Sequence, residues 1–222
     1  MSETRLLLAL KSMSEKLITM TTLLSTLSKQ LEQQSDGRHL EGTIRQITDA
    51  EENMDKLFED SATQIMEVEF LNVNPDYLLD VAKHFDLISD LIERAALLFQ
   101  YLTGFFDADI SELLTTGTAE INQIMLDCAK CMIILADNRV KVEELCETIV
   151  EREAVLDRIR EQFNSIATKM GASEHRIWLK DIFGHLDQIG DESRDLTITF
   201  RVIATKLEKQ RILNAKNPSR GT

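Results

Sequence analysis

Helix-breaking residues are scarce in this chain, and they gather at a few places. Only two prolines and eight glycines occur among its 222 residues. Between the breaks, Leu, Ile, Met, Ala, Glu, Lys and Gln dominate, and these residues lose little conformational entropy in a helix. We therefore expect an all-α fold of six long helices, the first beginning near residue 3 and the second running over 42–70.

The breaks also contain residues that cap helices. Asn74 is the expected N-cap of the third helix, with Pro75 at the first helical position, where its missing N–H does no harm. Gly171 is the expected C-cap of the fifth helix and Ser173 the expected N-cap of the sixth. The predicted breaks are SDGR at 35–38, NVNPD at 72–76, TGFFDADIS at 103–111, ADNR at 136–139 and MGASEH at 170–175.

The second half of the chain repeats the first. LLDVAKHFDLISD at 78–90 matches LKDIFGHLDQIGD at 179–191 at six of thirteen positions. Upstream, ITDAEENMDKL at 47–57 aligns with IVEREAVLDRI at 149–159 at nearly the same offset. We expect two related three-helix units, residues 1–104 and 105–213, in one continuous domain, followed by a disordered tail at 214–222.

Charge and cysteine content exclude several classes of protein. A net charge of −13 and a pI of about 4.8 disfavour binding to nucleic acid or to anionic lipid headgroups. Apolar runs fall far short of the ~20 residues that span a bilayer, so we expect a cytoplasmic protein without membrane insertion. The three cysteines, with CAKC at 128–131, are expected to be buried helix residues of a reducing compartment.

Acidic pairs four residues apart occur at matching positions of both repeats. Such a pair lies on one helix face, and oxygen-rich clusters bind cations such as Mg, Mn, Fe or Zn. Chance alone would give roughly six such pairs among 38 acidic residues, so a solvated face is the alternative for any one pair. A helical wheel places Asp86 and Asp90 opposite the apolar positions, as for exposed carboxylates. The candidate metal ligands are Glu51, Asp55, Asp86, Asp90, Glu153, Asp157, Asp187 and Asp191.

The repeated histidines are not expected to be ligands. On the wheel His84 and His185 point away from the acidic pairs, so we expect each at the edge of the core, bonded to a carbonyl. No histidine has Glu three positions before it, which argues against a ferritin-like di-metal enzyme. Trp178 is expected to pack against the helices.

The repeated stretches resemble the PhoU-like proteins. The stretches that carry this resemblance are ITDAEENMDKL, HFDLISDLIERAA, IVEREAVLDRI and KDIFGHLDQIGDESRD. The resemblance covers about residues 5–212, and the closer match is to the branch of phosphate transport regulators that serve Pit-type permeases. It implies two three-helix bundles with metal clusters on the acidic motifs. Where the related motif continues with another polar residue, this chain has Arg94 in the first half and Asp195 in the second. That difference predicts a weaker first site.

The expected function is therefore non-enzymatic regulation of inorganic phosphate transport. The protein would dock in the cytoplasm on a Pit-type membrane permease or a signalling partner, and it could also form a homo-oligomer. Two alternatives stay open: a metal-dependent, carboxylate-bridged enzyme, and a metal-free helical scaffold or adaptor.

Overall fold

The computed structural model describes residues 3–33, 37–66, 73–105, 107–171 and 173–216. Within them the predicted all-α class is confirmed. A short 3-10 helix, η1 (Gln100–Leu102), follows the third of six long helices, which are α1 (Glu3–Glu32), α2 (Gly37–Met66), α3 (Pro75–Phe99), α4 (Ala108–Ile134), α5 (Arg139–Ala167) and α6 (Glu174–Lys216).

Two of the predicted caps are confirmed, and one is placed differently. The Asn74 side chain accepts the Asp76 backbone N–H at 3.1 Å, and Ser173 Oγ accepts the Arg176 N–H at 3.2 Å. Helix α5 ends at Ala167, earlier than expected. Gly171 lies in the turn beyond it with φ of 68°, a left-handed conformation that favours glycine.

Two further caps were not predicted, although their residue types are typical. Asp107 accepts the N–H of Ile110 at the start of α4, and Asn138 accepts that of Lys141 at the start of α5, each at 3.1 Å. Helix α6 runs to Lys216, three residues into the predicted tail, and 217–222 lie outside the described residues. The expected end of the second helix at residue 70 lies outside them as well.

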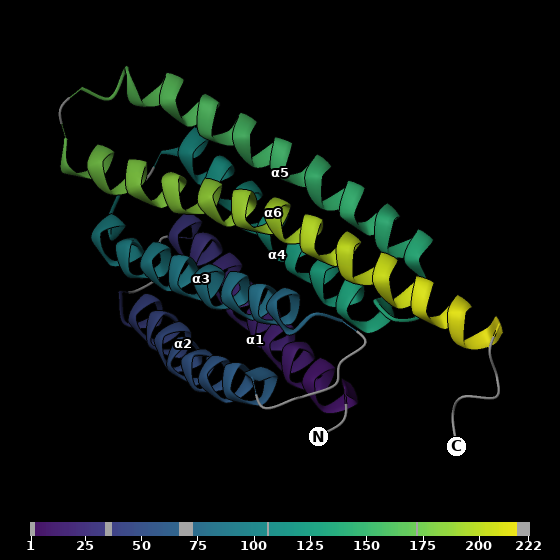
Figure 1. Ribbon diagram of the computed structural model, residues 1–222. Helices are drawn as coiled ribbons and strands as arrows, with labels where there is room; N and C mark the ends of the chain where they lie inside the picture. The colour runs from purple at the N-terminus through teal and green to yellow at the C-terminus, as the bar shows by residue number, and fades with distance from the viewer. Residues whose placement is uncertain (1–2, 34–36, 67–72, 106, 172, 217–222) are drawn as a thin grey trace.

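The six helices form two three-helix bundles that pack side by side (Figure 1). In the first, α1, α2 and α3 contact one another, and in the second α4, α5 and α6 do so. The bundles meet where α1 packs on α4 and α3 packs on α6, which leaves α2 and α5 on the outside. At 1.5 Å per residue the 43 residues of α6 span about 65 Å, so this helix extends along the whole elongated molecule.

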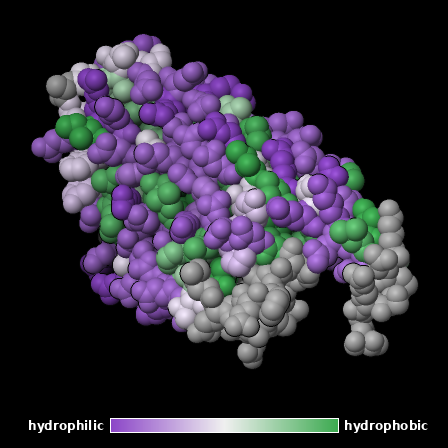
Figure 2. Space-filling view, viewed as in Figure 1, coloured by the Kyte–Doolittle hydropathy of each residue, from purple (hydrophilic) through white to green (hydrophobic). Residues whose placement is uncertain are grey.

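One continuous apolar core runs through both bundles, from Leu10 in α1 to Ala204 in α6. Trp178 packs against this core, as expected, and its ring stacks on Tyr101 with centroids 4.6 Å apart. The three cysteines are buried, which confirms their predicted placement. Outside the core the visible face is mostly hydrophilic, with separate apolar patches (Figure 2). No helix in the described part of the chain is both long and apolar enough to cross a bilayer.

Polar contacts of small side chains line the contact between α1 and α4. Ser28 Oγ and Thr118 Oγ1 are 2.9 Å apart, and Ser25 Oγ donates to the Thr118 carbonyl at 3.0 Å. Thr21 Oγ1 donates to Asn122 Oδ1 at 2.8 Å. Because these side chains are short and their hydroxyls are paired, the two helices approach closely while these polar groups stay hydrogen-bonded.

Candidate metal site

The eight predicted ligands form two clusters at equivalent places in the two bundles. Carboxylates of α2 and α3 interact electrostatically in the first, here called the α2–α3 cluster, and carboxylates of α5 and α6 do so in the second, the α5–α6 cluster. Glu93, one turn beyond Asp90, also interacts with Glu51. The α2–α3 cluster consists of Glu51, Asp55, Asp86, Asp90 and Glu93, and the α5–α6 cluster of Glu153, Asp157, Asp187 and Asp191.

Glu51 is the most perturbed carboxyl group of the α2–α3 cluster. It lies one turn after Ile47 and one turn before Met54, both fully buried, so the helix places it at the edge of the core. Burial, followed by the charges of Asp55 and Glu93, raises the pKa of Glu51 to about 7. The protonated Glu51 carboxyl also hydrogen-bonds Asp55. Below that pH a proton therefore lies between two carboxylates here.

Asp86 supplies a buried oxygen atom without a hydrogen-bond partner. The wheel placed this residue on an exposed face, but the side chain is only partly exposed and its Oδ1 is buried. Burial, then the charges of Asp55 and Asp90, raises the pKa of Asp86. The expectation of exposure is wrong because α2 packs beside α3 and its carboxylates approach from that side.

Arg94 pairs with the acids of its own cluster, as its position one turn after Asp90 indicated. Its Nε and Nη2 donate to the two oxygens of Asp90 at 2.7 and 2.6 Å. This bidentate pair neutralises one carboxylate of the α2–α3 cluster. Among the described residues, no lysine, arginine or histidine forms an ion pair with Glu51, Asp55, Asp86 or Glu93, so most of the negative charge in this cluster stays uncompensated.

In the α5–α6 cluster two arginines neutralise the most deeply buried acids. Arg194 donates to Glu153 Oε1 at 2.6 Å, and its other nitrogen lies 3.2 Å from Asp191 Oδ1. The Glu153 side chain is only 7% exposed. Burial raises the pKa of Glu153, and the Arg194 charge opposes that rise. An Arg–carboxylate pair of this kind supplies the compensation that a bound cation would otherwise give.

The second arginine, Arg160, donates to Asp187 Oδ2. The Asp187 side chain is only 5% exposed. Burial raises the pKa of Asp187, and Arg160 opposes the rise. Asp187 Oδ1, like its counterpart on Asp86, is buried without a hydrogen-bond partner. The two repeats thus share an orphaned carboxylate oxygen at equivalent positions.

These carboxylates do not form a preassembled coordination sphere. Among the described residues, no three carboxylate, histidine or thiol groups lie close enough together to hold one metal ion. Mutual repulsion of the acids keeps their oxygens apart unless a proton, an arginine or another cation lies between them. What the structure provides is uncompensated charge and two orphaned oxygens, with carboxylates as the donor type that hard cations prefer.

The histidines lie apart from the clusters, as expected, but their partners differ from the prediction. His84 is at the edge of the core, where its Nδ1 is 2.8 Å from Glu192 Oε2 and its Nε2 is 4.0 Å from Asp80. His185 Nδ1 is 3.4 Å from the Gln188 side chain. His84 therefore pairs with carboxylates rather than a backbone carbonyl, and with Glu192 it joins the two bundles.

Sequence reasoning identified the acidic residues and Arg94, but it missed the two arginine partners in the α5–α6 cluster. Arg160 comes three residues after Asp157, and Arg194 three residues after Asp191. That spacing places an arginine on the same helix face as the acid before it, so a search for oppositely charged neighbours would have found both. The preference for the second repeat as the stronger metal site did not take these arginines into account.

Fold and clusters together define an all-helical, six-helix protein built of two three-helix bundles, each with one acidic cluster. Comparison of the sequence with protein-family models gives no match, and comparison with curated proteins gives no significant match.

Proposed function

We propose that this protein is a non-enzymatic regulator of inorganic phosphate transport that binds a cation in the α2–α3 cluster. The single observation that carries the cation proposal is the set of carboxylates in that cluster without an arginine partner. Glu51, Asp55 and Asp86 are the proposed ligands, with Glu93 beside them. Asp86 Oδ1 is buried without a donor, and the pKa of Glu51 is raised to about 7. Both features mark a place where positive charge stabilises the fold.

The cation proposed is Mg, Mn, Fe or Zn, held by oxygen atoms from two helices. Binding requires small side-chain rotations, since three ligands do not converge in the described structure. The bound ion would replace the proton at Glu51 and fix α2 against α3. In the α5–α6 cluster Arg160 and Arg194 take the place of such an ion, which makes that cluster the weaker of the two candidates.

The link to phosphate transport depends on the resemblance of the repeated stretches to PhoU-like proteins. The two-bundle fold supports it, because the resemblance implied this architecture. We propose that the protein docks on a Pit-type permease at the cytoplasmic face of the inner membrane, or on a signalling partner. There the ion would hold the outer helix of the first bundle in the shape that the partner binds.

The test combines metal binding with phosphate uptake. Mn²⁺ titrated into EDTA-treated protein should bind with a defined stoichiometry, Asp86→Asn should lose this binding, and Asp60→Asn, an exposed acid of the same helix pair, should keep it. In cells that lack the protein, phosphate uptake through the permease should change, and Asp60→Asn but not Asp86→Asn should restore it. Unchanged uptake in the deletion strain would refute the transport function.

A further inference from the structure

A pocket of about 230 Å³ opens between α5 and α6, beside the α5–α6 cluster. Phe163 and Phe183, which line it, stack with their centroids 4.3 Å apart. Polar side chains of both helices line the rest: Arg160 and Asn164 from α5, and Lys180, His185 and Gln188 from α6. The volume is several times the ~30 Å³ that one water molecule occupies in the liquid, so a small ion fits with part of its hydration shell.

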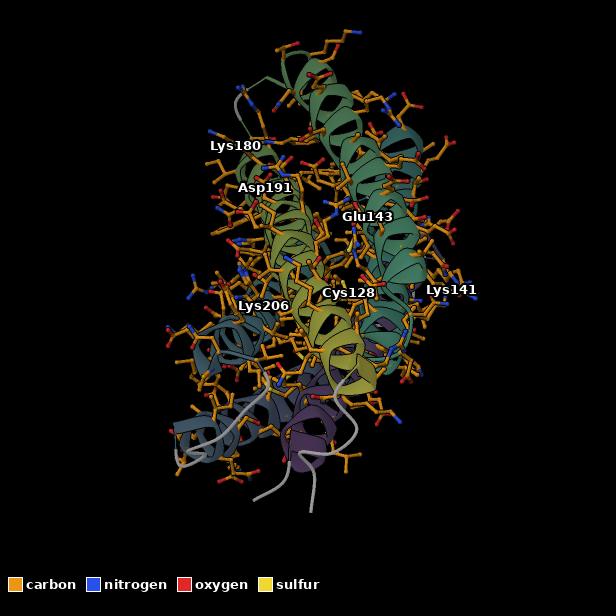
Figure 3. The ribbon with its side chains drawn as sticks, turned by 45° about the vertical axis from the view of Figure 1, so that its right-hand side comes forward. Cys128, Lys141, Glu143, Lys180, Asp191 and Lys206 are labelled. Carbon is orange, nitrogen blue, oxygen red and sulfur yellow. The ribbon has the colours of Figure 1, made fainter. Side chains whose placement is uncertain are left out.

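The charge lining this pocket is unusual for a protein with a net charge of −13. Two cationic groups, Arg160 and Lys180, and one imidazole face a single hollow, and Asp181 is the one acid among the lining residues. Asn164 and Gln188 add amide N–H donors. Figure 3 shows Lys180 near the start of α6, with Asp191 further along the same helix. Hydrogen-bond donors therefore outnumber anionic acceptors here.

Arg160 is held in place by a buried carboxylate. It donates to Asp187 Oδ2, while its own side chain is 51% exposed at the pocket. A guanidinium has five N–H donors, and this contact uses one of them. Because Asp187 already restricts the Arg160 side chain, the arginine loses less conformational entropy when it binds a second anion in the pocket. The planar guanidinium can donate two parallel N–H bonds to the oxygens of such an anion.

We propose that this pocket binds a small tetrahedral oxyanion of the inorganic phosphate class through Arg160, Lys180 and the Asn164 amide. The aromatic rings form its floor. The inference deepens the proposed function, and it rests on that function only for the choice of phosphate as the probe. Because Arg160 also contacts Asp187, an anion in the pocket shares a cationic group with the α5–α6 cluster.

Gly184 allows the pocket to be blocked without disturbing the fold. It lines the pocket, and a Cβ atom built on it has no neighbour within 4 Å. Gly184→Leu therefore directs an apolar side chain into the hollow, and it replaces a residue that is unfavourable within a helix. Gly42→Leu is the matched control, because Gly42 is also helical with nothing within 4 Å of its Cβ, and it lies on α2 in the other bundle.

The experiment is calorimetric titration of the full chain with inorganic phosphate, in EDTA so that no metal can bridge phosphate to the acidic clusters. We expect saturable binding at one site. Lys180→Gln should weaken it about tenfold, the usual effect of removing one charge-assisted hydrogen bond. Gly184→Leu should abolish it. Lys141→Gln, which removes an exposed lysine at the start of α5, and Gly42→Leu should bind as the parent chain does.

The proposal would be overturned if the parent chain showed no saturable phosphate binding in EDTA, or if Gly184→Leu bound phosphate with parental affinity. Phosphate binding that appears only when Mn²⁺ is restored would also overturn it, and would at the same time support the metal site of the proposed function. Circular dichroism identifies any variant that has lost binding because it is misfolded. If every variant is folded and all of them, including Lys141→Gln and Gly42→Leu, lose phosphate binding, that result also contradicts the proposed pocket.

Discussion

Replacing Glu51 by Gln tests the electrostatics of the α2–α3 cluster, because it removes one charge and keeps the shape of the side chain. The pKa of Glu51 is raised to about 7 from an ordinary 4.5 by burial and by the neighbouring acids. Between these two pH values the native state holds a proton that the unfolded state has released. Stability therefore falls as the pH rises from about 4.5 to about 7, and Glu51 is destabilising at any higher pH.

The magnitude follows from the two pKa values. At 1.36 kcal/mol for each pKa unit, the difference between 4.5 and about 7 corresponds to about 3 kcal/mol. Glu51 is partly exposed, so water screens some of this interaction, and about 1 to 2 kcal/mol remains. In EDTA at pH 8, Glu51→Gln should raise the free energy of unfolding by that amount, and at pH 4 it should change little.

The assay is urea unfolding followed by circular dichroism at both pH values, with Glu52→Gln as the matched control. Glu52 is the next residue of the same helix and is exposed, so its substitution changes the formal charge equally. We expect the control to stay within about 0.5 kcal/mol of the parent at either pH. Equal effects of the two variants at pH 8, or destabilisation by Glu51→Gln in EDTA, would refute the electrostatic reasoning.

Three further predictions concern the arginines, the helix packing and the metal. Arg194→Gln leaves the buried Glu153 carboxylate without its partner and should cost about 1 to 3 kcal/mol in urea unfolding at pH 8, and less at pH 4. Gly190→Ala places a Cβ 2.9 Å from Leu156 Cδ1 and should destabilise by about 1 to 2 kcal/mol, whereas Gly42→Ala should stabilise by up to about 1 kcal/mol. Mn²⁺ binding should release a proton at pH 6 and little at pH 8, as measured by calorimetry in buffers of different ionisation enthalpy.

The helices could be predicted from the sequence because their signals are local. Scarce breakers and the cap at Asn74 indicate where helices begin, and neither depends on distant contacts. The repeat of acidic pairs likewise indicated that two equivalent clusters exist. The ends of helices were less predictable, as α6 shows by running on to Lys216, because a helix ends where packing and capping cease to stabilise it.

What the sequence could not give is the environment of each acid. A wheel describes one helix alone, so it placed Asp86 on an exposed face, whereas α2 lies against α3 in the fold and Asp86 Oδ1 is buried. It also could not show that Arg160 crosses from α5 to Asp187 on α6. Burial and cross-helix pairing are set by tertiary packing, and they decide which acids need a cation.

The different arginine content of the clusters has a physical consequence. A buried carboxylate paired with arginine is already compensated, and a metal ion there has to displace the arginine. The α2–α3 cluster has one such pair, between Arg94 and Asp90, at its more exposed end. We therefore expect the two repeats to share a fold but to differ in cation binding.

The most direct test of the central claim is anomalous X-ray diffraction from crystals grown with Mn²⁺, recorded at the manganese absorption edge. We predict an anomalous peak between α2 and α3, at coordination distance from oxygens of Glu51, Asp55 and Asp86, and a weaker peak or none beside Arg160 and Arg194. The account would be contradicted if crystals grown with saturating Mn²⁺ showed no anomalous peak at the α2–α3 cluster and the carboxylate oxygens of Glu51, Asp55 and Asp86 remained apart.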